Sequence, residues 1–125
     1  SVETEKRIAD AIAEHGSAAY ITPSGAVLNL MTKLADEGDL AGFARAVIRL
    51  ARAKPANAMF VRNAIPAKIT NFIMRHHQVT TAALLAWVQA HPGWEDEVKD
   101  AVRDPVKFER TVNGIAEAVK RQGAN

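Results

Sequence analysis

Apolar residues recur at helical spacing along almost the whole chain, and this periodicity limits the folds that it can adopt. The clearest stretch is residues 40–51, where apolar side chains return every three or four positions: Leu40, Phe43, Ala44, Val47, Ile48 and Ala51. Such spacing gathers them on one face of a helix. No stretch alternates apolar and polar residues long enough to predict a strand. We therefore predict an all-α fold, a compact single domain over residues 1–125 with about six or seven short helices.

Glycine, proline and capping residues predict where the helices begin and end. The predicted helices run over residues 2–15, 25–37, 40–54, 66–77, 81–90, 94–102 and 105–122. Residues 56–64 favour neither period and are assigned a short helix, and residues 17–24, which contain a proline, are assigned an extended connector. Because residues 81–90 are almost wholly apolar, we expect that helix at the centre of the core.

The aromatic residues are predicted to serve mainly in the core. Five of them lie on the apolar stripes or begin one: Phe43, Phe72, Trp87, Trp94 and Phe108. Tyr20 and Phe60 lie outside the stripes, so they are the aromatic side chains that we expect to be available for stacking on a ligand.

Composition excludes several classes of protein. A chain of 125 residues, 48% of them hydrophobic, is long enough to close a core without disulfides. Cysteine is absent, which excludes disulfide scaffolds, thiolate metal sites and thiol nucleophiles. No apolar run approaches the roughly 18 to 20 residues that cross a bilayer, and the charged start lacks the apolar stretch of a signal peptide. We therefore expect a soluble, cytoplasmic protein with no membrane partner.

The residues that could carry chemistry do not form a recognisable catalytic pattern. The four histidines, at positions 15, 76, 77 and 91, include no HExxH motif and no pair at the i, i+4 spacing of a helical metal site. The clustered carboxylates near Asp36 and Glu95 lie at predicted helix ends, where capping explains them. No nucleophile elbow, phosphate-binding glycine loop or dinucleotide fingerprint is present. We predict a non-enzymatic protein with no cofactor and no metal ion.

Charge is distributed very unevenly along the chain, although the formal net charge is only +2. Residues 1–40 hold three bases and seven acids, residues 41–80 hold seven bases and no acid, and residues 81–125 hold six bases and seven acids. On a helix, Arg45, Arg49 and Arg52 fall within about 60° of one another, nearly opposite the apolar stripe. Like charges placed in this way repel, so an external anion would explain why they are together.

Nucleic acid is the first candidate for that anion, with DNA favoured over RNA. Arginine suits it because the guanidinium group makes two hydrogen bonds to one phosphate. Two helix pairs have the spacing of a helix-turn-helix, but each would present carboxylates to the bases, so we expect contact with the phosphate backbone. The predicted contact residues are Arg45, Arg49, Arg52, Lys54, Arg62, Lys68, Arg75 and His77.

Two other interpretations of the basic segment are open. In the first, it is the face of a protein-interaction module that docks an acidic protein partner or self-associates, for instance with the N-terminal third of a second copy. Alternatively, the basic third faces the acidic N-terminal third inside one molecule. In that case the carboxylates of residues 1–40 would neutralise it.

Overall fold

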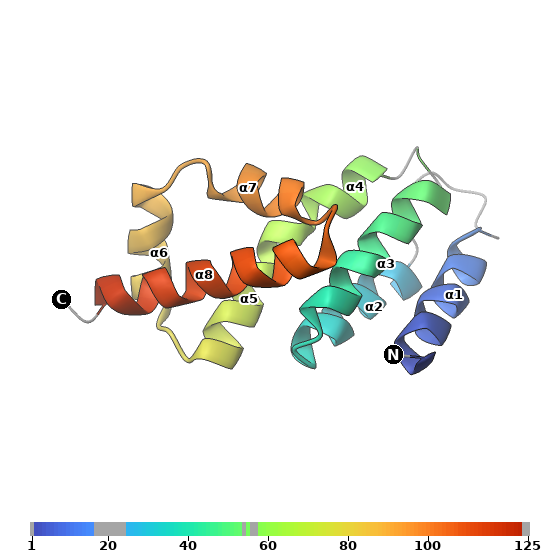
Figure 1. The fold of residues 1–125 in the computed structure, drawn as a ribbon, viewed down its shortest axis with the longest axis horizontal. Coiled ribbons are helices and arrows are strands. Elements are labelled where there is room, and N and C mark those ends of the chain that lie inside the picture. The colour runs from blue at the N-terminus through green and yellow to red at the C-terminus, as the bar shows by residue number, and fades with distance from the viewer. Residues whose placement is uncertain (1, 17–24, 54, 56–57, 124–125) are drawn as a thin grey trace.

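All regular structure in the described part of the chain is helical. The computed structural model describes residues 2–16, 25–53, 55 and 58–123 (Figure 1). Its eight helices are α1 (Val2–Gly16), α2 (Gly25–Asp36), α3 (Leu40–Ala53), α4 (Ala58–Asn63), α5 (Ile65–His77), α6 (Thr81–Ala90), α7 (Trp94–Ala101) and α8 (Pro105–Gly123). The all-α prediction is confirmed. The predicted connector over residues 17–24 and the predicted contact residue Lys54 lie outside the described residues.

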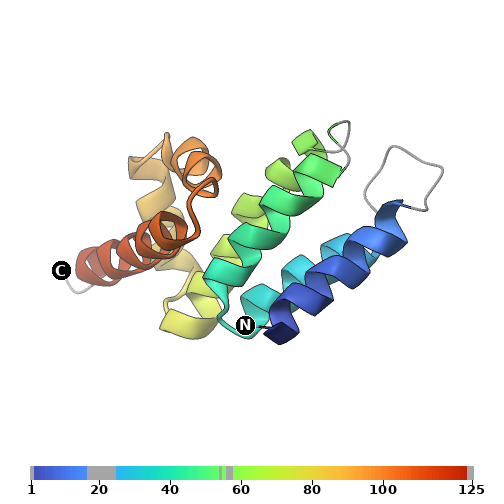
Figure 2. The ribbon, with the colours of Figure 1, turned by 45° about the vertical axis from the view of Figure 1, so that its right-hand side comes forward.

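The helices form one bundle in which α3, α5 and α8 connect the two ends. Helices α1, α2 and α3 pack against one another at one end, with α1 alongside α3 in the turned view (Figure 2). Helix α8 runs across α5 and reaches α3, and α6 and α7 pack against α8 on the side of the molecule away from α1 (Figure 1). The acidic first helix therefore lies directly against the arginine-bearing third helix.

The stacked rings of Phe43 and Phe108 join α3 to α8 in the core. Both side chains are fully buried, and their parallel rings have centroids 5.6 Å apart. The predicted anchors Trp87 and Trp94 are also buried, each 6% exposed, whereas Phe60 is 53% exposed. These burial predictions are confirmed. For Phe43 and Phe108, the helical spacing of the apolar residues indicates the side of the helix that faces the core. Tyr20 lies outside the described residues.

Local hydrogen bonds cap the predicted helix starts. The Asp39 carboxylate accepts a hydrogen bond of 2.8 Å from the Gly42 amide, the Thr80 hydroxyl accepts one of 3.1 Å from the Ala83 amide, and the Asp104 carboxylate accepts one of 3.1 Å from the Val106 amide. A Cβ at Gly42 would lie 2.3 Å from the Asp39 carboxylate, so that carboxylate would have to move to accommodate a side chain there. Capping depends on neighbours in sequence, which is why these boundaries were predictable.

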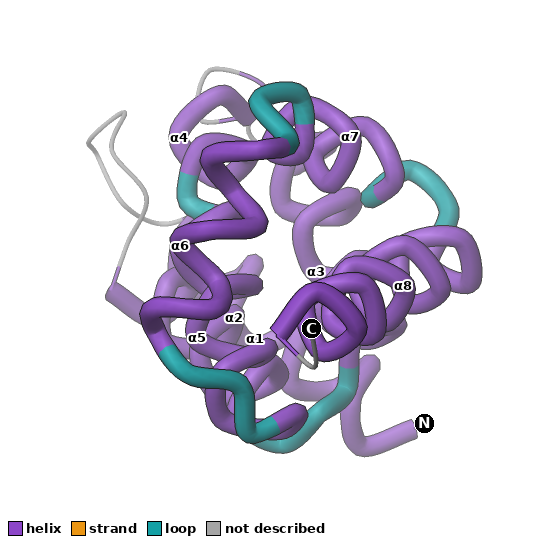
Figure 3. Tube along the Cα trace, turned by 90° about the vertical axis from the view of Figure 1, so that its left-hand side faces the viewer, coloured by secondary structure: helices purple, strands orange, loops and turns teal. Residues whose placement is uncertain are grey.

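The predicted central position of α6 is wrong. Leu84 and Trp87 are its only buried residues, Leu85 is 55% exposed, and the helix lies at the edge of the bundle (Figure 3). An apolar composition does not by itself give a helix a burial direction. The centre of the bundle is instead filled by α3, α5 and α8, whose side chains dominate the core.

Candidate functional site

Helix α3 presents three arginines on the side away from its buried stripe, as the helical spacing predicts. Arg45 Nε lies 3.3 Å from Glu5 Oε1, and Arg49 Nη1 donates a hydrogen bond of 2.5 Å to Glu5 Oε2. Arg52 is exposed and has no ion pair within the described residues. A single carboxylate of α1 therefore serves two arginines, and the α3 face keeps an excess of positive charge.

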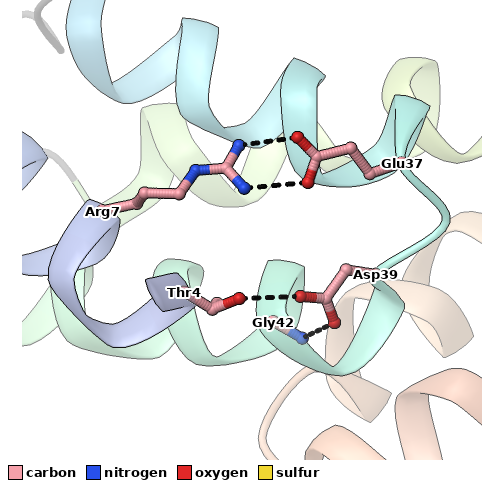
Figure 4. Close-up of polar contacts among 5 residues, drawn as sticks. All are labelled: Thr4, Arg7, Glu37, Asp39 and Gly42. Carbon is pink, nitrogen blue, oxygen red and sulfur yellow. Dashed lines mark hydrogen bonds and ion pairs between the residues drawn. The ribbon is translucent and has the colours of Figure 1, made fainter. Parts of the chain in front are cut away.

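Polar contacts near Glu5 fix the position of α1 (Figure 4). The Arg7 guanidinium donates two hydrogen bonds, of 2.8 and 3.0 Å, to the Glu37 carboxylate, and the Thr4 hydroxyl donates one of 3.2 Å to Asp39. The hydrogen bond from Arg7 lowers the pKa of Glu37 below its ordinary value. Together with the buried side chain of Ile8, these contacts hold Glu5 beside the arginines of α3.

A second shared carboxylate lies where α4 meets the end of α7. Arg62 Nη2 donates a hydrogen bond to Asp100 Oδ1, and Arg103 Nη2 lies 3.6 Å from the same oxygen. The hydrogen bond from Arg62 lowers the pKa of Asp100. Here too two arginines share one acidic side chain, and the Arg103 side chain remains 76% exposed.

The other predicted residues have partners on α2 and α8. Lys68 donates a hydrogen bond to the Thr32 hydroxyl, and Arg75 lies 3.2 Å from Asp36, both on α2. The His77 ring lies 3.1 Å from Asn113 Oδ1 and 3.8 Å from Glu117 Oε1, both on α8. The structure therefore divides the predicted contact residues among three groups, on α3, at the α4–α7 junction and on α5. Each of these groups has its own intramolecular partners.

An apolar hollow that the sequence did not indicate adjoins the second arginine pair. It has a volume of about 240 Å³, lies between α3, α4 and the α7–α8 turn, and is here called the corner groove. Its lining residues are Val47, Ile48, Ala51, Ala58, Arg62, Val102 and Arg103. The lining comes from three separate segments. Because a helical wheel considers one helix at a time, the sequence pattern did not predict this groove.

Two large apolar side chains of α4 are exposed, and neither lines the corner groove. Met59 is 72% exposed and Phe60 is 53% exposed. They line a separate hollow together with Pro55 and Asn63. The sequence signal for these exposed apolar side chains is the contiguous apolar run from Met59 to Val61. Of these three residues, only Val61 is buried.

The part of the chain that the structure describes holds neither a metal site nor a membrane-spanning helix. Within it, no three His, Asp or Glu side chains are grouped so that they could hold a metal ion. No helix there has the length and apolar character needed to cross a membrane. Comparison of the chain with protein-family models, with curated proteins and with solved structures finds no match.

Proposed function

We propose that the protein is a non-enzymatic interaction module that binds an acidic protein partner at the corner groove. The observation that carries this proposal is the presence, at one place, of an apolar hollow and of two arginines, Arg62 and Arg103, that share one carboxylate. Arginine is enriched at protein interfaces, and the buried core of an interface is more apolar than its rim. A phosphate backbone has no apolar group to fill the groove, whereas an acidic polypeptide has both carboxylates and apolar side chains.

Nucleic acid is the second candidate, and the sharing of Glu5 between Arg45 and Arg49 favours it. With Arg52 exposed beside them, three arginines face one carboxylate. The proposed contact is with the phosphate backbone of DNA through these three side chains. Arg45, Arg49 and Arg52 do not line the corner groove, so this face offers charge without the apolar hollow, and this makes the second candidate weaker than the first.

Fluorescence anisotropy with two labelled probes separates the candidates. The first probe is a helical peptide of about 15 residues that carries Glu and Leu on one face, and the second is a DNA duplex. The proposal predicts tighter binding of the peptide, and the Arg62→Gln/Arg103→Gln double variant should reduce that binding. Arg121→Gln, in the last turn of α8, is the matched control and should leave it unchanged.

The opposite result would support nucleic acid instead. In that case the duplex binds more tightly than the peptide, and its affinity falls with salt concentration, with a logarithmic slope of roughly −3 if the three arginines of α3 contact phosphate. The Arg62→Gln/Arg103→Gln variant would then change peptide binding no more than Arg121→Gln does.

A further inference from the structure

The size of the corner groove limits what can occupy it. Its volume of about 240 Å³ is below the roughly 300–1,000 Å³ of typical small-molecule sites. Val47 and Val102 are buried at 3% and 5% exposure, while Ile48, Ala51 and Ala58 are half-buried around them. A hollow with an apolar floor and this volume suits one large side chain of a polypeptide better than a whole small molecule.

The arginines beside the groove retain hydrogen-bonding capacity toward a partner. Asp100 contacts Nη2 of Arg62 and Nη2 of Arg103, and a guanidinium group has five N–H donors in all. The two arginine side chains are 41% and 76% exposed. Ile48 is only half-buried and lies at the edge of the buried stripe of α3, and Arg52 follows it by one helical turn, so Arg52 adds positive charge beside the groove. A carboxylate that arrives from outside would meet unused donors.

The described fold also restricts how a peptide could bind. Addition of a strand requires an exposed sheet edge, and residues 2–16, 25–53 and 58–123 contain no strand. Recognition of a polyproline helix uses grooves lined by aromatic rings, and no aromatic residue lines the corner groove. Docking of an amphipathic helix into an apolar groove between helices is the mode that fits.

We propose that the corner groove receives an amphipathic helix of an acidic protein, one large apolar side chain of which enters the space between α3 and α4. Carboxylates three or four residues away on the same face of that helix pair with Arg62 and Arg103. This inference rests on the proposed function and adds the form of the partner and the position of its anchor.

Variants that fill the groove without changing its charge test the proposal. Ala58→Leu and, separately, Ala51→Leu place a larger side chain in the groove, and leucine is compatible with a helix. The probe is the same Glu- and Leu-bearing peptide, compared with a version in which every Leu is replaced by Ala. We expect the Leu peptide to bind the unmodified protein at least about tenfold more tightly than the Ala peptide. Either filling variant should abolish that difference, and Ala86→Leu, at an exposed position on α6, should preserve it.

The failure of this inference is distinguishable from failure of the proposed function. If the two peptides bind with equal affinity and Arg62→Gln/Arg103→Gln weakens both, the proposal that an apolar side chain enters the groove is wrong. The proposal that the protein binds an acidic partner would still hold. Binding of neither peptide would overturn both proposals. Thermal unfolding of each variant identifies any that does not fold, and the two filling variants serve as substitutes for each other.

Discussion

Sharing of one carboxylate between two arginines occurs at two places among the described residues, and it controls how much basic charge is available to a partner. Glu5 holds Arg45 and Arg49, and Asp100 holds Arg62 and Arg103. Because these pairs are largely exposed, each contributes little to stability. Their greater effect is electrostatic competition with any external anion.

Removal of each shared carboxylate should therefore strengthen binding at its own site. Asp100→Asn is expected to raise affinity for the acidic Leu-bearing peptide a few-fold, because Arg62 and Arg103 lose their intramolecular partner. Glu5→Gln should leave that affinity unchanged. Anisotropy titrations at two salt concentrations measure both effects. If Glu5→Gln strengthens peptide binding and Asp100→Asn does not, the partner binds the α3 face instead.

The buried phenylalanines provide a test of the core. Phe43→Ala is expected to reduce the free energy of unfolding by about 3–5 kcal/mol, because it empties a fully buried site stacked on Phe108. Phe60→Ala removes the same group from a side chain that is 53% exposed, and a change within about 0.5 kcal/mol is expected. Urea denaturation measures both. Similar losses in the two variants would show that α4 is packed differently.

Residue patterns predicted burial well and predicted charge partners poorly. The core positions of Phe43, Phe72 and Phe108 followed from spacing within single helices, and all three are buried. The partner of Arg49 is Glu5, 44 positions away in sequence. Which helix faces cross is decided by packing of the whole chain, so a helical wheel showed that three arginines share a face but not that α1 lies across it.

Helix α6 shows the same limit for a whole element. Its boundaries were predicted correctly, at residues 81 and 90, because Thr80 caps it and a proline follows it. Its position in the bundle was predicted incorrectly, because a segment that is apolar all round lacks the polar face that orients an amphipathic helix. Helix α3, with polar and apolar faces opposed, was placed with the correct side toward the core.

A matched pair of substitutions tests the orientation of α6. Leu84 is 5% exposed and Leu85 is 55% exposed. Leu84→Asn should reduce the free energy of unfolding by about 2–4 kcal/mol, because it buries an amide without partners and loses apolar contacts. Leu85→Asn should change it by less than about 1 kcal/mol. Midpoints of urea unfolding give both values, and a larger loss in Leu85→Asn would mean that the buried face has been assigned incorrectly.

Over the whole molecule, much of the uneven charge in the sequence is balanced inside the fold. Carboxylates from residues 1–40 contact Arg45, Arg49 and Arg75, and those from residues 81–125 contact Arg62 and His77. The interpretation in which the basic third faces acidic parts of its own chain therefore describes these contacts. What the fold leaves for a partner is the excess of arginines over shared carboxylates, together with the apolar surface beside Asp100.

These contacts give stability a defined dependence on pH. Hydrogen bonds from Arg7, Arg62 and Lys120 lower the pKa values of Glu37, Asp100 and Glu117, respectively. A carboxylate with a lower pKa in the folded state contributes stability that is fully present above its unfolded pKa. That stability is lost as pH falls through the folded pKa, so the free energy of unfolding should decline below about pH 4.

Glu37→Gln isolates one of these contributions. At neutral pH the variant should be less stable than the unmodified protein by up to about 1 kcal/mol, since it loses the charged partner of Arg7 on a half-exposed surface. The difference should shrink as pH falls toward about 3, because Glu37 then becomes protonated in the unmodified protein as well. Glu109→Gln is the control, since Glu109 has no ion pair among the residues that the structure describes. Urea unfolding across this range measures both variants, and a difference that stays constant with pH would mean that the Arg7–Glu37 pair does not hold α1 in solution.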